Sequence, residues 1–239
     1  TFAAIPSSVA YQDLASLIAA RAGGGGDVAR EQARSHGDQQ RSPRRPARDD
    51  EHDRHGAAGG ERPVDRQIGD ADHGENLDRG YTAVQAAFEQ ALPQDPAQTF
   101  KTVAMTLMSK VGGASGPLLG TAYLRMSMKA SADMGPQEIA DLIEAANAGI
   151  QARGKATEGE KTMVDAWAPA SRAAQAAVDA GGDCLTVLQA AAEATAAGAE
   201  ATKPMVATKG RASYLGERSA GHLDPGAVST SYLLQAAAK

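Results

Sequence analysis

Three carboxylates lie close together in the segment 65–74, DRQIGDADHG. Like charges at this spacing repel one another and raise each other's pKa unless something positive lies among them. A hard divalent cation is the simplest such partner, because it takes oxygen ligands and can leave positions open for phosphate oxygens. Asp65, Asp70 and Asp72 therefore point to a metal site of the kind used in phosphoryl transfer.

This segment has two other interpretations. Asp and Gly favour turns for local reasons, so a solvated turn also accounts for the composition. A calcium loop needs Gly at its sixth position and Glu at its twelfth. Counted from Asp70 those positions hold Glu75 and Tyr81, which excludes that loop. The residues alone leave the turn and the metal site open.

Three further islands rich in Gly and polar residues interrupt the chain at 111–117 (VGGASGP), 153–163 (RGKATEGEKTM) and 209–226 (KGRASYLGERSAGHLDPG). The first precedes a helix expected near Pro117, where free N–H groups and the helix dipole favour a phosphate. The second supplies another helix N-terminus, and the third combines Arg211 and Arg218 with a His and an Asp, as an anion clamp would. Plain turns, a simple cap and surface charges remain the alternatives.

Two standard motifs are poor matches. The segment 149–155 fits G-x-x-x-x-G-K, but Ala156 stands where a P-loop has the Ser or Thr that holds magnesium, and no strand precedes it. The segment 113–117 resembles a nucleophile elbow only loosely, because Pro117 occupies the place of its second Gly.

The elements that position these islands are expected to be helices. Aromatic residues make up only 4% of the chain, Ala dominates the apolar content, and no segment alternates as a strand would. The predicted helices are 10–21, 81–92, 95–111, 117–132, 136–153, 162–180, 184–201 and 227–238. Short Gly-containing loops between them favour antiparallel neighbours, so the fold class is all-α.

Composition excludes several classes of protein. A net charge of −5 gives no argument for nucleic acid or an acidic membrane as partner. No stretch approaches the roughly 20 apolar residues that span a bilayer, and the first 22 residues do not read as a signal peptide. The lone Cys184 excludes an internal disulfide and suits a reducing compartment, so we expect a cytoplasmic protein.

The segment 23–63 departs from the helical pattern. It is packed with Arg, Gly, His, Asp, Gln and Pro, and Val28 is its only larger apolar side chain. Such a segment cannot bury enough apolar surface to become ordered, so it is expected to be a solvated linker. An alternative hypothesis is an out-of-frame translation whose frame is restored near Pro63. The chain thus divides into 1–22, 23–63 and a helical domain over 64–239.

Taken together and in order, the islands resemble the nucleotide-binding L subunit of dihydroxyacetone kinase, a domain that also forms the C-terminal half of single-chain kinases of that family. The resemblance rests on GDADHG, GGASGP, GEKTM, GRASYLGERS and GHLDPG, and it covers roughly residue 65 to the C-terminus. It implies an eight-helix antiparallel up-and-down barrel whose loops at one end hold ADP or ATP with two magnesium ions.

The resemblance also implies roles for individual residues. The magnesium ligands would be Asp65, Asp70 and Asp72. The nucleotide would lie against His73, Gly74, Asn76, Ala114, Ser115, Gly154, Met163, Arg211, Asp224, Pro225 and Gly226. Of these, Arg211 would be catalytic, because its guanidinium favours charge that develops on the transferred phosphoryl group. The family places a continuous amphipathic helix before the first Asp, whereas this chain has 23–63, and 10–21 would be the remnant of that helix.

The function implied is transfer of a phosphoryl group from ATP to dihydroxyacetone held on a separate K subunit, with an M subunit rephosphorylating the bound ADP. A fragment of a single-chain, ATP-exchanging kinase is the alternative within the family. A non-catalytic ADP-sensing module that binds a transcriptional regulator, and a plain helical scaffold, are alternatives from other classes.

Overall fold

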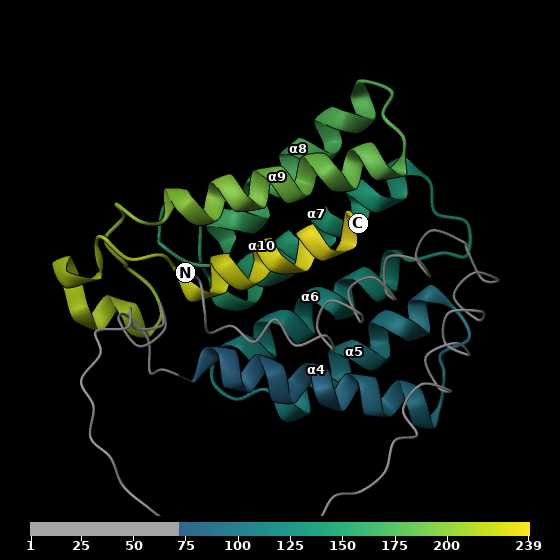
Figure 1. Cartoon of the computed structure of the whole chain (residues 1–239), viewed down its shortest axis with the longest axis horizontal. Helices are drawn as coiled ribbons and strands as arrows, with labels where there is room; N and C mark the ends of the chain where they lie inside the picture. Colours follow the sequence, from purple (N-terminus) through teal and green to yellow (C-terminus); the bar gives the residue numbers. More distant parts are fainter. Residues whose placement is uncertain (1–71) are drawn as a thin grey trace, which may run out of the picture.

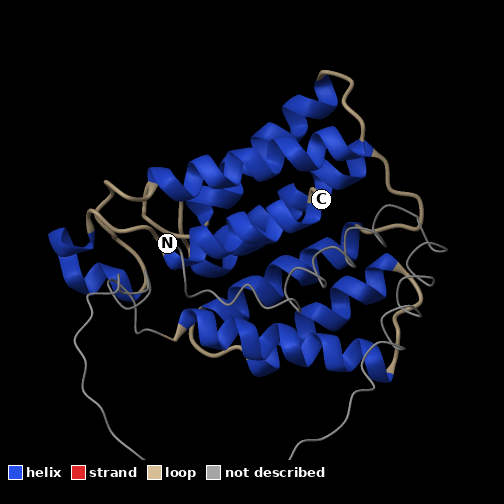
Figure 2. Cartoon of the chain, viewed as in Figure 1, coloured by secondary structure: helices blue, strands red, loops and turns tan. Residues whose placement is uncertain are grey.

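The computed structural model describes residues 72–239, and these are entirely helical (Figures 1 and 2). Seven α-helices and one 3-10 helix follow one another in this part of the chain: α4 (His73–Gln90), α5 (Pro96–Lys110), α6 (Ser115–Lys129), α7 (Pro136–Gly154), α8 (Val164–Asp179), α9 (Cys184–Ala201), η1 (Arg211–Ser219) and α10 (Pro225–Ala237). The expected all-α class is confirmed. The helix predicted over 10–21, the segment 23–63 and Asp65 and Asp70 lie outside the described residues.

Local sequence signals explain where several helices begin. Asp95, Asp183 and Asp224 each precede a helix, and each side chain accepts a hydrogen bond from a backbone N–H of the first turn. Such caps satisfy N–H groups that have no partner within the helix. Proline follows at the first position of α5, α7 and α10, where its missing N–H costs nothing.

Two boundaries differ from the sequence-based prediction. Helix α4 begins at His73 and not near Tyr81, because Asn76, Leu77 and Gly80 are buried at helical spacing in what looked like a polar loop. The predicted loop at 209–219 contains η1, which follows Gly210 (φ 64°) and bends at Gly216 (φ 53°). Glycine reaches these positive φ angles without the steric cost that a side chain would add.

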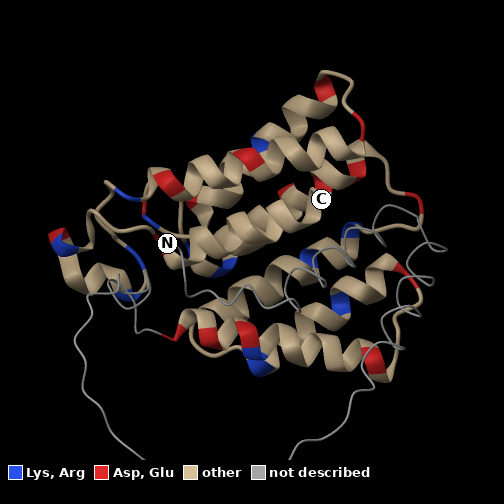
Figure 3. Ribbon diagram, in the orientation of Figure 1, with Lys and Arg blue, Asp and Glu red and all other residues tan. Residues whose placement is uncertain are grey.

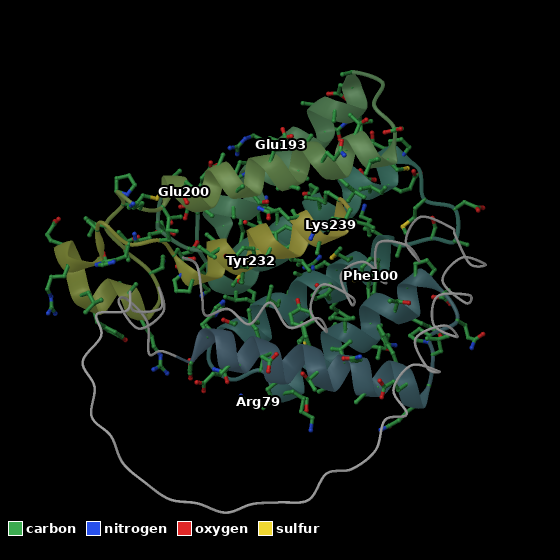
Figure 4. The ribbon with its side chains drawn as sticks, viewed as in Figure 1. Arg79, Phe100, Glu193, Glu200, Tyr232 and Lys239 are labelled. Carbon is green, nitrogen blue, oxygen red and sulfur yellow. The ribbon has the colours of Figure 1, made fainter. Side chains whose placement is uncertain are left out.

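The helices pack in chain order, each against the next, from α4 to α10. In Figure 1, α4, α5 and α6 lie along one side of the molecule and α8 and α9 along the other, with α10 between them. The core contains a few large side chains, among them Tyr81, Phe100 and Trp167, set among many alanines. The Phe100 and Tyr123 rings stack with centroids 6.3 Å apart, and Figure 4 labels Phe100.

This up-and-down order brings alternate connections to the same end of the bundle. The start of α4 and the α5–α6, α7–α8 and α9–α10 connections gather on the left of Figure 1. These are the four predicted islands, although they are far apart in the sequence. The fold therefore collects at one end the residues that the motifs singled out.

That the helices close into a barrel remains a prediction. Within residues 72–239, α4 and α10 do not pack side by side, and the helix predicted over 10–21 would be the eighth member. No helix among the described residues is both long and apolar enough to cross a bilayer.

Candidate nucleotide-binding site

A pocket of about 470 Å³ opens at this end of the bundle. Its volume lies in the range typical of small-molecule sites, roughly 300–1,000 Å³. Eleven of the predicted site residues line it: Asp72, His73, Asn76, Ala114, Ser115, Gly154, Met163, Arg211, Asp224, Pro225 and Gly226. Gly74 is buried within α4 and is not among the lining residues. The fold thus brings all four islands to one cavity, while the role of each residue remains a prediction.

In the described part of the chain, four helices are preceded by an Asp: Asp72, Asp95, Asp183 and Asp224. Of these four, only Asp72 makes no capping hydrogen bond with its side chain. It immediately precedes α4, is only half-buried, and lines the pocket. An Asp at this position ordinarily caps. Its carboxylate is therefore not used by the α4 backbone and remains available to a ligand.

His73 lines the pocket and connects α4 to α6 and α10. Its Nδ1 lies 3.0 Å from Ser115 Oγ at the start of α6, and its Nε2 lies 3.1 Å from Ser229 Oγ on α10. Burial lowers the pKa of His73 to about 4, although the neighbouring Asp72 charge acts in the opposite direction. The ring is therefore neutral at neutral pH, and its two nitrogens lie within hydrogen-bonding distance of the two serine hydroxyls.

Arg79 fixes the side chain of Asn76, which lines the pocket. Its Nη2 donates to Asn76 Oδ1 and its Nε donates to the Lys110 carbonyl at the end of α5, 3.1 Å away. Figure 4 shows Arg79 on α4 at the surface of the molecule. Because Oδ1 already accepts from Arg79, the NH₂ group of Asn76 is the part of the amide left to donate, which suits an anionic ligand in the pocket that Asn76 lines.

We expect Arg79→Ala to weaken Mg-ADP binding by about three- to ten-fold, because loss of one charge-assisted hydrogen bond frees the Asn76 amide to rotate. Isothermal calorimetry measures this change. The exposed Lys101 of α5 provides a control, since Lys101→Ala removes a surface charge away from the pocket. Equal affinities for the Arg79→Ala variant and the wild type would show that Asn76 needs no such support.

Several cationic side chains also line the pocket. They are Arg153, Lys161, Lys209 and Arg211, and among the described lining residues Asp72 and Asp224 are the only carboxylates. Figure 3 shows Lys and Arg on the loops at this end of the molecule. Lys209 Nζ also lies 3.9 Å from Glu160 Oε1, an ion pair that connects the η1 segment to the loop before α8. The excess of positive charge is suited to a polyphosphate.

Apolar side chains also line the pocket. They are Leu118 of α6, Ile150 of α7, Ala156 and Met163 of the α7–α8 loop, and Val164 of α8. A lining of this kind accepts a flat apolar group, while the charged side chains accept its polar substituents. The pocket therefore has both apolar and charged lining, as a nucleotide site requires.

The α7–α8 loop is held by Asp165, which the sequence analysis did not single out. Asp165 is 2% exposed, and its carboxylate accepts hydrogen bonds from the N–H groups of Gly159 (2.5 Å) and Thr162 (2.7 Å). Lys161 lies between these two residues and was also missed. Its position in the GEKTM motif was a signal, but nothing in a single sequence shows that a Lys side chain is buried.

Among residues 72–239, no three His, Cys, Asp or Glu side chains are grouped so that they could hold a metal ion. Of the predicted ligand set, only Asp72 lies among the described residues, so the set remains a prediction.

Comparison with known proteins decides the family. A family model described as the DAK2 domain matches residues 67–239, which is most of the chain. The chain belongs to the DAK2 domain family. The resemblance inferred from the four islands is thereby confirmed, and the pocket is that of a DAK2 domain.

Curated relatives of this DAK2 domain include separate subunits and longer chains. It is 46% identical over 174 residues to the ADP-binding subunit of PEP-dependent dihydroxyacetone kinase 1 of Listeria innocua, covering 72% of this chain and 82% of the relative. It is 40% identical to the corresponding Escherichia coli subunit, with 72% and 83% covered. It is 34% identical to human triokinase/FMN cyclase, where the match covers 72% of this chain and 30% of the relative.

Solved structures support the same fold. The dihydroxyacetone kinase of C. freundii in its native form aligns with a TM-score of 0.55 at 24% identity, covering 73% of this chain and 30% of that one. The same kinase in complex with AMP-PNP and Mg²⁺ aligns with a TM-score of 0.54 at 23% identity, covering 95% and 33%.

Proposed function

We propose that this DAK2 domain is the nucleotide-binding subunit of a dihydroxyacetone kinase, which binds ADP or ATP with magnesium and transfers a phosphoryl group to dihydroxyacetone held on a partner K subunit. The observation that carries the proposal is the convergence of four separate motifs on one pocket that has both apolar and cationic lining. The relatives named as ADP-binding subunits of such kinases, at 40% and 46% identity, support it.

The residues present fit a magnesium ion. Mg²⁺ prefers carboxylate and phosphate oxygens, and the Asp72 carboxylate lines the pocket without a capping role. Asp65 and Asp70 would complete the ligand set for the two ions that the resemblance implies. When bound, magnesium neutralises phosphate charge and orients the phosphate oxygens.

The chain's own residues would orient the nucleotide and stabilise charge. Backbone N–H groups at the start of α6, next to Ala114 and Ser115, would donate to phosphate oxygens. The Asn76 amide would add a donor, and Arg211 would favour the charge that develops on the transferred group. The substrate hydroxyl would have its general base on the partner subunit, because none is evident in these loops.

Two finer parts of the proposal concern partners and location. We infer that an M subunit rephosphorylates the bound ADP in place, since the higher identities are to subunits of PEP-dependent kinases and the single-chain relative is only 34% identical. A role in binding a transcriptional regulator through the ADP end remains a separate proposal. We also infer a cytoplasmic location, from the lone cysteine.

The decisive experiment mixes the purified chain with a K subunit, dihydroxyacetone, ATP and Mg²⁺ and measures dihydroxyacetone phosphate. A parallel thermal melt tests binding, because a ligand that binds only the folded state raises its stability. Product formation supports the kinase. A higher melting temperature with Mg-ADP but no product would favour the ADP sensor. The absence of both the temperature shift and the product would favour a helical scaffold.

Removal of the Arg211 guanidinium should lower kcat by about 10²- to 10³-fold while ADP affinity changes less, because the group acts mainly on charge that develops during transfer. Arg211→Ala in the complete assay tests this. Arg218→Ala is the matched control, since Arg218 is exposed on the same 3-10 helix and is not a lining residue. An equal loss in both variants would indicate a general effect of η1 and remove the catalytic role from Arg211.

A further inference from the structure

Lys161 has an unusual environment for a lysine. It is 1% exposed, and its backbone has a left-handed φ of 59° in the loop before α8. A residue with a side chain adopts this conformation at an energetic cost, so the surrounding structure must hold it there. The burial of the ammonium group is a second cost, which only good hydrogen bonds and nearby carboxylates can offset.

The ammonium group joins three segments at the pocket. Lys161 Nζ donates to the carbonyl of Thr202 after α9, 2.6 Å away, and to the carbonyl of His222 before α10, 2.5 Å away. Thr202 is itself fully buried, and its Oγ1 accepts the N–H of Asp224 at 2.9 Å. A continuous set of hydrogen bonds thus runs from the loop before α8 through Thr202 to Asp224.

Asp224 is the residue at which this network reaches the pocket. Its carboxylate accepts the N–H of Ala227 at 2.7 Å and so caps α10, while the Pro225–Gly226 turn lines the cavity. The charged groups that face Asp224 are Lys161 from the loop before α8 and Asp165 from α8. The pKa of Asp224 is raised to about 7, mainly by burial and also by the charge of Asp165, while the Ala227 N–H and the charge of Lys161 act in the opposite direction.

We propose that Lys161 is a positioning residue of the nucleotide site, which holds Asp224 and the Pro225–Gly226 turn in place through its ammonium group and does not itself bind phosphate. Two of its three N–H donors are taken by backbone carbonyls. Burial lowers the pKa of Lys161, and the charges of Asp224 and Asp165 oppose that effect. The inference rests on the proposed nucleotide-binding function.

The test measures Mg-ADP affinity by calorimetry between about pH 6 and pH 9 for the wild type, Lys161→Gln, Lys161→Arg and Lys155→Gln. We expect Lys161→Gln to bind about ten-fold more weakly at neutral pH, which is a loss of about 1.4 kcal/mol. Without the positive charge the pKa of Asp224 rises, so the midpoint of the pH dependence should move to higher pH. Lys161→Arg keeps the charge and should restore both affinity and midpoint in part.

Lys155→Gln is the matched control, because Lys155 is an exposed lysine of the same loop with a similar φ of 49°. It should bind as the wild type does. The inference is overturned if Lys161→Gln binds Mg-ADP with the wild-type affinity. It is also overturned if the affinity falls equally at every pH, so that the midpoint of the pH dependence does not move. A wild-type affinity that does not titrate near pH 7 overturns it as well.

If the Lys161→Gln variant does not fold, the Asp224→Asn variant is measured in its place. It should bind Mg-ADP about ten-fold more weakly without a pH midpoint near neutrality, since the titrating carboxyl is gone. Wild-type affinity or an unchanged midpoint in this variant overturns the inference. A wild-type chain that does not bind Mg-ADP at all rejects the proposed function instead, so the two failures are distinguishable.

Discussion

Asp72→Asn should abolish phosphoryl transfer, with kcat/KM lowered by at least about 10³-fold, because the amide cannot supply the negative charge that a hard cation requires. The structure makes this substitution unusually selective. Asp72 does not cap α4, so its replacement removes no hydrogen bond from the helix backbone. The melting temperature without ligand should therefore change little, while the rise caused by Mg-ADP should disappear.

Glu75→Gln is the control for this prediction. Glu75 lies in the first turn of the same helix, is exposed, and carries the same charge, but it does not line the pocket. Its replacement should leave both activity and the Mg-ADP shift near the wild-type values. If Asp72→Asn retains a Mg²⁺-dependent ADP shift, the metal site does not depend on Asp72 and the assignment of this carboxylate is wrong.

Gly198→Ala should strongly destabilise the bundle. An added Cβ on Gly198 of α9 would lie 2.2 Å from the Asp165 carbonyl oxygen and 3.0 Å from Ala166 Cα on α8. Pro169 lies inside α8 and has no N–H, so that carbonyl lacks its usual helical donor and α9 approaches it closely. Backbone atoms cannot move aside as a flexible side chain can.

We expect Gly198→Ala to lower the free energy of unfolding by about 3 kcal/mol, since overpacking outweighs the gain of up to about 1 kcal/mol in helix propensity. The displaced α8 start would also loosen the Asp165 carboxylate from Gly159 and Thr162, so Mg-ADP affinity should fall as well. Urea denaturation and calorimetry measure the two effects. The adjacent exposed Ala197 offers a control, because Ala197→Leu adds more volume on the solvent side.

A stability of Gly198→Ala equal to that of the wild type would mean that α8 and α9 can separate without loss. A loss of stability with full ADP affinity would uncouple the α8–α9 contact from the pocket.

The sequence by itself determined the class of the fold and most of the helices. Alanine-rich segments with apolar residues at helical spacing predict helices locally, and Asp95, Pro96, Asp183, Asp224 and Pro225 mark three of their starts. The order of the four islands was also sufficient for the family. These features are local, or they consist of residue types at fixed spacing, so a single sequence contains them.

Only the tertiary structure decided how the islands meet and which residues support them. Alternate connections of an up-and-down bundle reach the same end, which brings together Ser115 and Ser229, both in contact with His73. The burial of Lys161 depends on carbonyls 41 and 61 residues away. Such contacts follow from the packing of whole helices, and hydrophobic periodicity within one segment contains no information on which distant backbone group a polar side chain will meet.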